Sequence, residues 1–121
     1  MTKNVYVIED NIKNMKLFKA ILKLIPDIKI FSETRGDLGL ELIKSGNPDL
    51  IILDIQLPEI SGIDIAKELR NIDKFEETPI IAVTSFAMKG DRERILDVGI
   101  NEYVPKPIKV QEFRELVKSL L

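Results

Sequence analysis

The sequence predicts an α/β protein built on a five-stranded parallel sheet, doubly wound in a (βα)5 arrangement with helices on both faces. Short apolar runs alternate five times with segments of helical periodicity, and no linker, low-complexity stretch or internal repeat interrupts them. Alternation at this spacing is typical of a parallel sheet covered by helices, with right-handed crossovers. A length of 121 residues suits one domain, so we expect a single domain over residues 1–121.

The composition excludes several classes of site. The chain has no cysteine and no histidine, which removes disulfides, thiolate chemistry, the usual general base and any phosphohistidine on this chain. Its 18 Lys and Arg against 20 Asp and Glu give a net charge of −2, so no nucleic-acid binding is expected. No apolar run approaches the roughly 20 residues of a membrane span, and there is no signal-peptide core. We therefore expect a soluble, cytoplasmic protein with no membrane contact.

Apolar runs rich in β-branched residues predict the five strands. They lie at residues 5–8, 29–31, 50–53, 79–83 and 102–104. Helical periodicity predicts helices at residues 12–25, 37–44, 63–72, 89–98 and 110 to the end. Residues 73–78 are expected to form a polar loop. In the last helix we expect an inward-facing set, made up of Val110, Phe113, Leu116, Val117 and Leu120.

The first predicted helix has an apolar arc wider than the roughly 100° that a core-facing helix needs. The arc contains Leu17, Phe18, Ile21, Leu22, Leu24 and Ile25. One interpretation is a helix wedged between the sheet and a neighbouring helix, and the other is that part of the arc docks a partner. We favour the first for most of these residues, with Met15 and Phe18 as the candidate exceptions because they lie nearest the strand ends.

Polar side chains follow four of the predicted strands. Glu9 and Asp10 follow the first strand, Asp54 the third, Thr84 the fourth and Lys106 the fifth. In open α/β sheets the ligand lies at the carboxyl ends of the strands, where the strand order reverses. We therefore expect these side chains to meet at one site, with Asp54 as the group on which the chemistry happens.

Three carboxylates in one crevice repel one another, and a hard divalent cation relieves the repulsion. Carboxylate and carbonyl oxygens together with water suit Mg²⁺, with Mn²⁺ as the alternative. We expect Asp10 and Asp54 as direct ligands, Glu9 acting through water, and the backbone carbonyl of Gln56 as a third protein oxygen.

A carboxylate can also attack a phosphoryl group and form an acyl phosphate. Asp54 is the predicted nucleophile, Lys106 the cation that neutralises the transferring oxygens, and Thr84 a hydroxyl donor. Taken singly, each residue has an ordinary interpretation: Asp54 as a turn cap, Glu9 and Asp10 as charges at a helix N-terminus, Thr84 as a helix cap and Lys106 as a solvated loop residue. Their combination is what predicts a phosphorylation site.

These motifs resemble the receiver domain of two-component response regulators, in the CheY-like superfamily. The matching residues are 7–11, 48–58, 61–62, 79–84, 99 and 103–107. The resemblance extends over the whole chain and implies a flavodoxin-like fold with strand order 2-1-3-4-5. It implies that Asp54 is the phospho-acceptor, Glu9 and Asp10 the acidic metal-binding pair, Thr84 the switch hydroxyl and Lys106 the phosphoryl-contacting lysine.

The resemblance also implies roles for residues next to the site. Tyr103 matches the aromatic residue whose rotamer follows phosphorylation, and its alternative interpretation is a half-buried strand tyrosine. The Lys106–Pro107 peptide bond is expected to be cis. Gln56 and Phe86 match positions that tune hydrolysis of the acyl phosphate.

The implied function is a signalling switch of a two-component system or phosphorelay, which takes part in its own phosphotransfer and autodephosphorylation but is not otherwise an enzyme. The donor would be a phosphohistidine on a sensor histidine kinase or histidine phosphotransfer protein, docking at Met15, Phe18, Pro107 and Ile108. A downstream protein would bind the face formed by the fourth helix, fifth strand and fifth helix. The chain resembles stand-alone receivers, and its start at Met1 favours these over a domain of a hybrid kinase.

One residue departs from the family pattern, because Glu9 stands where Asp is more usual, and this puts metal affinity in question. Three other functions stay open. Haloacid-dehalogenase-type phosphatases also use Asp, Thr, Lys and Mg²⁺, but they need an acid where this chain has Gln56. A flavin-binding module fits poorly, because the chain has no Trp and no phosphate-binding loop after the first strand. The third is a receiver that signals without phosphorylation.

Overall fold

The computed structural model describes residues 2–85 and 89–121. Its strands are β1 (Lys3–Ile8), β2 (Ile28–Glu33), β3 (Leu50–Asp54), β4 (Ile80–Thr84) and β5 (Glu102–Pro105). Its helices are α1 (Ile12–Leu22), α2 (Gly36–Lys44), α3 (Gly62–Arg70), α4 (Lys89–Asp97) and α5 (Val110–Leu120), with a short 3-10 helix, η1 (Asp73–Phe75). Strands and helices alternate along the chain as predicted.

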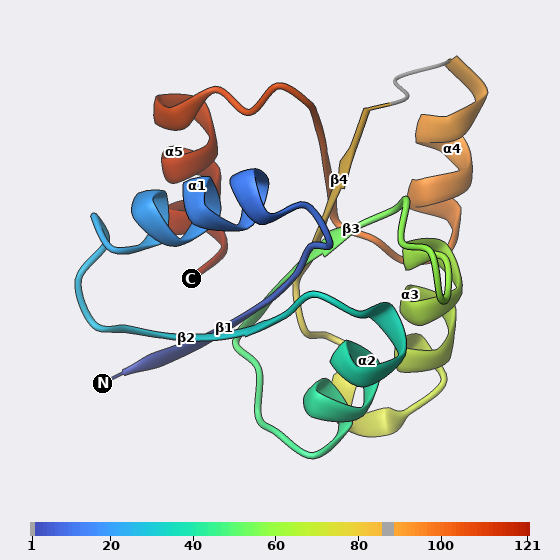
Figure 1. Cartoon of the computed structure of the whole chain (residues 1–121). Helices are drawn as coiled ribbons and strands as arrows, with labels where there is room; N and C mark the ends of the chain where they lie inside the picture. Colours follow the sequence, from blue (N-terminus) through green and yellow to red (C-terminus); the bar gives the residue numbers. More distant parts are fainter. Residues whose placement is uncertain (1, 86–88) are drawn as a thin grey trace.

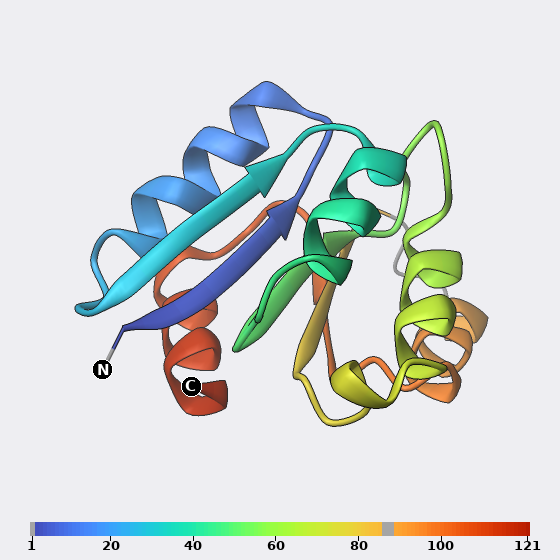
Figure 2. The same ribbon diagram turned by 90° about the horizontal axis from the view of Figure 1, so that it is seen from below.

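The five strands form one parallel sheet in the order β2-β1-β3-β4-β5, which confirms the predicted fold class and strand order. Helices α1 and α5 cover one face of this sheet, and α2, α3 and α4 cover the other (Figure 1). The turned view in Figure 2 shows the sheet running between these two helical layers. The strand order reverses between β1 and β3, so the carboxyl ends of these two strands are neighbours.

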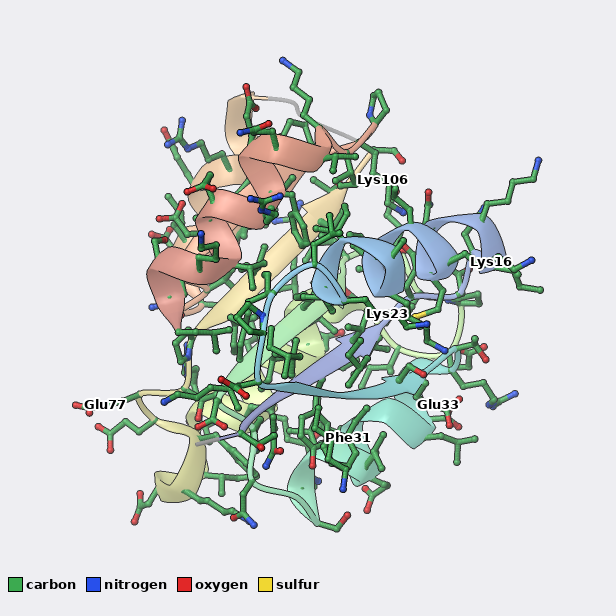
Figure 3. All side chains as sticks on the ribbon, turned by 90° about the vertical axis from the view of Figure 1, so that its left-hand side faces the viewer. Lys16, Lys23, Phe31, Glu33, Glu77 and Lys106 are labelled. Atoms are coloured by element: carbon green, nitrogen blue, oxygen red, sulfur yellow. The ribbon has the colours of Figure 1, made fainter. Side chains whose placement is uncertain are left out.

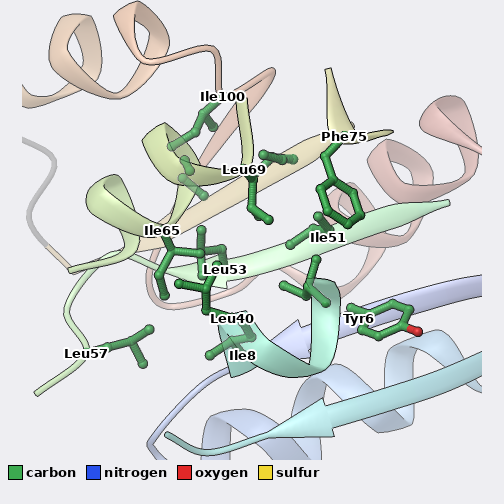
Figure 4. Close-up of a cluster of buried hydrophobic side chains, with 14 of the residues drawn as sticks. Tyr6, Ile8, Leu40, Ile51, Leu53, Leu57, Ile65, Leu69, Phe75 and Ile100 are labelled. Atoms are coloured by element: carbon green, nitrogen blue, oxygen red, sulfur yellow. The ribbon is translucent and has the colours of Figure 1, made fainter. Parts of the chain in front are cut away.

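Successive residues of each strand enter two separate hydrophobic cores, because side chains alternate across a sheet. Val5 and Val7 of β1 pack with α1 and α5, whereas Tyr6 and Ile8 pack with α2 and α3. Figure 4 shows the second of these cores, with residues from the sheet meeting residues of α2 and α3. Since both faces are covered, β3 and β4 are buried along their whole length, which explains their uninterrupted apolar sequence.

Two residues predicted to face inward are exposed instead. Helix α1 ends at Leu22 rather than at residue 25, so Leu24 lies outside it and is 58% exposed. Val110 is the first residue of α5 and is 45% exposed. Both predictions were wrong because periodicity assigns a residue to a face without showing how far the neighbouring elements extend along the helix.

The loop predicted at residues 73–78 contains a buried aromatic residue. Phe75 lies in η1 and packs into the core under α3 (Figure 4). Arg70, at the end of α3, donates hydrogen bonds to the carbonyl oxygens of Phe75 and Gly99 and to Asn101 Oδ1. The loop is therefore anchored by two contacts: the Phe75 ring packs in the core, and the Arg70 guanidinium group is hydrogen-bonded to the loop backbone.

Charged side chains project outward from the helices and loops. Figure 3 shows Lys16 on the outer side of α1, Lys23 directly after its end and Glu77 on the loop before β4, all of them exposed. Over residues 2–85 and 89–121, no helix combines the length and the apolarity that crossing a membrane requires.

Candidate functional site

The sheet topology brings the ends of β1 and β3 together. Ile8 is the register partner of Leu53. Glu9 and Asp54 are the residues that come next in the two chains of the pair, so they lie side by side. The carboxylate oxygens of Glu9, Asp10 and Asp54 lie within 4.8 Å of one another. Glu9 and Asp54 are buried and Asp10 is exposed. The structure therefore brings together the three acidic side chains that were predicted to meet at the strand ends.

Lys106 joins this cluster from the loop that follows β5. Its Nζ lies 3.2 Å from Asp54 Oδ2, to which it donates a hydrogen bond, and 3.0 Å from Glu9 Oε1. The second contact is an ion pair whose angle is not that of a hydrogen bond, so Glu9 Oε1 has no hydrogen-bond partner in the part of the chain that the structure describes. Lys106 follows β5, and its peptide bond to Pro107 is cis, as predicted.

Backbone groups fix the orientation of both buried acids. Asp54 Oδ1 accepts a hydrogen bond from the Gln56 N–H at 2.9 Å, which leaves Oδ2 for Lys106. Glu9 Oε2 accepts from the Asn11 N–H at 3.1 Å. Asn11 also caps α1, because its Oδ1 accepts from the Asn14 N–H. The loop after β1 therefore holds Glu9 and starts the helix at the same time.

Gly62 allows the chain to turn close to Asp54. A Cβ at this position would lie 2.3 Å from the carbonyl oxygen of Asp54 and 2.8 Å from the Cα of Ile55. No side chain fits in that space without moving the backbone of Asp54 and Ile55. The sequence analysis included residues 61–62 among the motifs shared with the family but gave Gly62 no part in the site, and only the spatial contact shows that it has one.

The two buried carboxyl groups are shifted in opposite directions. Burial raises the pKa of Glu9 to about 7, and the nearby Asp54 carboxylate adds to this, while Lys106 and the Asn11 amide oppose it. Burial would also raise the pKa of Asp54, but its contacts with Glu9, the Gln56 amide and Lys106 outweigh burial and lower it. Asp54 is therefore ionised at neutral pH, as its predicted role as a nucleophile requires.

Thr84 ends β4 beside Asp54. Val83 is the register partner of Asp54, and the buried Thr84 is the next residue. Thr84 lines a cavity of about 160 Å³ together with Gln56 and Arg94. Its backbone carbonyl accepts a hydrogen bond from the Lys106 N–H at 2.8 Å, so the backbones that carry the predicted hydroxyl and the predicted cation are directly joined.

Tyr103 is half-buried in the edge strand β5. It packs against the core formed with α2, α3 and α4, and it lines a cavity of about 230 Å³ with Pro107 and Phe113 among others. This agrees with both interpretations of Tyr103, a switch residue or a half-buried strand residue. Phe86, the other aromatic residue singled out near the site, lies outside the described residues.

The predicted docking surface needs correction at two residues. Met15 and Phe18 are buried in the core between α1, the sheet and α5, where the Phe18 ring lies 5.3 Å from that of Phe113. They belong to the core and not to a contact surface. Pro107 is exposed and Ile108 half-buried. Ile12, which the sequence analysis did not single out, is 66% exposed at the start of α1.

Comparison with known proteins identifies the same fold and motifs. Residues 5–118 match the response regulator receiver domain. The polar-differentiation response regulator DivK of Brucella ovis is 47% identical over 122 residues, which cover 100% of this chain and 98% of that protein. DivK of Brucella anthropi is also 47% identical, over 121 residues, with the same coverage of 100% and 98%.

Solved structures agree with the sequence relatives. The receiver domain of the sensor histidine kinase PA1611 from Pseudomonas aeruginosa PAO1, with a magnesium ion coordinated in its active site cleft, is 28% identical, with a TM-score of 0.88 and coverage of 99% of this chain and 98% of that one. The chemotaxis protein CheY4 of Vibrio cholerae is 19% identical, with a TM-score of 0.91 and full coverage of both chains, and supports the fold alone. With its fold, acidic cluster and sequence relatives in agreement, this chain belongs to the response regulator receiver domain family.

Proposed function

We propose that this protein accepts a phosphoryl group on Asp54 from a phosphohistidine donor, with Mg²⁺ bound, and that the modification changes its partner binding. Receiver domains are the signalling switches of two-component systems, so the general class is given by family membership. The single observation that supports the specific chemistry is the position of Lys106. Its Nζ lies 3.2 Å from Asp54 Oδ2 inside a cluster of three acids.

In the proposed reaction an oxygen of Asp54 attacks the phosphorus of the donor. The new oxygen–phosphorus bond forms as the nitrogen–phosphorus bond breaks, and the bonding electron pair leaves with the imidazole nitrogen of the donor. No general base is required, because the lowered pKa keeps Asp54 ionised. This chain has no histidine, so the phosphohistidine must be on another molecule. Lys106 and the Thr84 hydroxyl would contact the transferring oxygens.

The residues at the site fit a hard divalent cation. Glu9, Asp10 and Asp54 offer carboxylate oxygens within 4.8 Å of one another, and the Gln56 carbonyl would add a fourth oxygen. Burial first, and then the neighbouring Asp54 carboxylate, raise the pKa of Glu9 to about 7, and Lys106 offsets this only in part. When bound, Mg²⁺ would neutralise charge on the phosphoryl oxygens during transfer. The magnesium ion in the related PA1611 receiver domain supports Mg²⁺, with Mn²⁺ as the alternative.

The proposed switch uses the segments that carry Thr84 and Tyr103. Thr84 would move toward the phosphoryl group, Tyr103 would fill the vacated space, and the face formed by α4, β5 and α5 would change. The phosphoryl group shifts the equilibrium only by its differential interaction with the two conformations. The downstream protein is therefore proposed to bind that face.

For the phosphodonor we propose a docking surface made up of Ile12, Pro107 and Ile108. Ile12 replaces Met15 and Phe18 because it is exposed at the start of α1, whereas they are buried. The donor would be a sensor histidine kinase or a histidine phosphotransfer protein, and we propose the cytoplasm as the location, as expected from the sequence. The family match argues against the phosphatase and flavin-binding alternatives.

The test is intact mass after incubation with acetyl phosphate and Mg²⁺. We expect one added phosphoryl group that requires Mg²⁺ and is absent in Asp54→Asn. Asp64→Asn is the matched control, because Asp64 is an exposed aspartate in the first turn of α3, and it should be modified like the wild type. An adduct that persists in Asp54→Asn would overturn the proposal, and so would a protein that signals to its partners equally well with Asp54→Asn.

A further inference from the structure

We infer that Glu59 is a positioning residue for the phosphorylation site, because it ties the loop that carries Gln56 to the start of α2. The inference rests on the proposed function and assigns a role to a residue outside the acidic cluster. Glu59 lies in the loop between β3 and α3. Its Oε1 accepts a hydrogen bond from the Gly36 N–H at 3.0 Å, although the two residues are 23 positions apart in the chain.

Helix α2 receives no side-chain cap from the residue that precedes it. The first N–H groups of a helix have no partner inside the helix, and the side chain just before it often supplies an acceptor. Here the N-cap residue is Arg35, whose guanidinium group has only donors and pairs with Asp37 at 3.0 Å. Glu59 therefore supplies the acceptor from another part of the chain, and its negative charge also suits the N-terminus of the helix.

An apolar contact joins the same loop to the same helix. A Cβ at Gly36 would lie 2.8 Å from Ile60 Cγ2 and 3.2 Å from Leu57 Cδ1, so both side chains reach the helix where the glycine leaves room. Leu57 is buried in the core formed with α2 and α3, and Gly36 is buried as well. The loop is therefore held against α2 by a hydrogen bond and by the packing of two side chains.

This loop carries a residue that contacts Asp54. The Gln56 N–H donates to Asp54 Oδ1 at 2.9 Å, and the Gln56 carbonyl is the oxygen proposed to bind the divalent cation. Because a peptide unit is planar, the direction of that carbonyl is set by the peptide that joins Gln56 to Leu57. The base of the loop is closed where the Gly62 N–H donates to the carbonyl oxygen of Ile55 at 3.0 Å. The contacts with α2 hold the segment between these two ends, and with it the Gln56 carbonyl.

The first test measures Mg²⁺ binding by calorimetry, without a phosphodonor. Glu59→Ala removes the hydrogen bond to α2, and we expect it to weaken Mg²⁺ binding roughly tenfold, as the loss of a group that orients a metal ligand does. Glu59→Gln removes the charge but keeps an oxygen that accepts from the Gly36 N–H, so its affinity should stay close to that of the wild type. Glu77→Ala is the matched control, because it removes the charge of another exposed glutamate, and it should also bind like the wild type.

Gly36→Ala perturbs the same contact from the side of the helix. The added methyl group would displace Ile60 and Leu57, so we expect weaker Mg²⁺ binding although Glu59 is unchanged. Unfolding midpoints in a chelator show whether each variant is folded. A residue that only capped α2 would lower the midpoint when replaced by alanine and would leave the Mg²⁺ affinity unchanged.

The second test follows the loop without metal. We expect the backbone amide resonance of Gln56 in the metal-free protein to shift in Glu59→Ala. The same resonance should stay in place in Glu59→Gln and in Glu77→Ala, because both variants keep an acceptor for the Gly36 N–H. This readout reports the position of the loop and does not depend on the cation or on phosphorylation.

Two results would overturn the inference: wild-type Mg²⁺ affinity in Glu59→Ala, or an equal loss of affinity in Glu59→Ala and Glu59→Gln. The first would make Glu59 a helix cap alone, and the second would mean that its charge acts and its hydrogen bond does not. If the wild-type protein binds no Mg²⁺, the proposed metal site fails, and the Gln56 amide resonance still decides whether Glu59 holds the loop.

Discussion

Glu9 and Asp54 are neighbouring buried carboxyl groups that share one lysine, yet their pKa values move apart. Asp54 has a backbone amide on one oxygen and the Lys106 ammonium on the other, and these favour its ionised form. Glu9 is dominated by burial, which favours its neutral form. Adjacent acids with separated pKa values are typical of sites where each group has its own role. Here the proposed nucleophile is ionised and its neighbour titrates near neutrality.

The raised pKa of Glu9 predicts that the metal-free protein loses stability as pH rises toward neutrality. Between its ordinary pKa of 4.5 and the folded value of about 7, the folded state binds more protons than the unfolded state. Stability from this group is therefore complete below about pH 4.5 and is lost as pH rises through about 7. We expect the thermal midpoint measured in a chelator to fall by a few degrees over this range.

Glu9→Gln is the control for this prediction, because it keeps the size of the side chain and removes its titration. Asp54 and Lys106 do not titrate between pH 4.5 and 7, because the pKa of Asp54 is lowered from 3.8 and that of Lys106 is raised from 10.5. Neither group therefore contributes to the expected change in the thermal midpoint. A midpoint that falls equally in Glu9→Gln would show that another group causes the pH dependence.

At the scale of the element, η1 shows that a mostly polar stretch of sequence can contain a residue of the core. Residues 73–78 contain five charged or hydroxyl side chains around one phenylalanine. Arg70 and the 3-10 turn fold this stretch back, so that Phe75 enters the core under α3. The burial of Phe75 depends on residues that lie in other elements, so the sequence of residues 73–78 alone does not predict it.

We predict that Phe75→Ala destabilises the protein by about 3–5 kcal/mol, because it removes a fully buried ring and leaves a cavity. Urea denaturation measures this change. Glu77→Ala is the control on the same loop, since Glu77 is exposed, and its effect should stay within about 0.5 kcal/mol. Equal effects of the two substitutions would mean that η1 is not an anchored part of the fold.

The elements themselves were predictable because their apolar periodicity is strong. All five strands and all five helices occur where the pattern indicated, and the errors are confined to the ends of strands and helices, to η1 and to single residues. Leu24 and Val110 are exposed because they lie at or beyond the end of a helix. Met15 and Phe18 were docking candidates but are buried, because Phe113 from the far end of the chain covers Phe18. Such packing partners are remote in sequence, so periodicity alone does not reveal them.

At the scale of the whole molecule, the site follows from the topology of the sheet. Glu9, Asp54 and Lys106 lie far apart along the chain but end or follow parallel strands, whose carboxyl ends share one edge. This made their proximity predictable from the sequence. The ion pair between Glu9 and Lys106 and the close approach of Gly62 to Asp54 were not predictable, because both depend on distances of a few ångströms between separate loops.

The same topology predicts which part of the molecule responds to phosphorylation. Thr84 ends the strand before α4, and Lys106 follows β5 and leads to α5. Their backbones are joined through the Lys106 N–H and the Thr84 carbonyl oxygen. Movement of either residue toward a phosphoryl group on Asp54 therefore acts on the segments that lead to α4 and α5, whereas β2 and α2 carry neither residue.

We expect amide hydrogen exchange to change in α4, β5 and α5 after incubation with acetyl phosphate and Mg²⁺, and to stay unchanged in β2 and α2. Mass spectrometry of proteolytic fragments measures this difference. Asp54→Asn treated in the same way is the control, and it should exchange like the untreated protein throughout. Changes confined to β2 and α2 would place the response on the other side of the molecule, and the proposed partner face would then be wrong even if Asp54 is the phosphorylated residue.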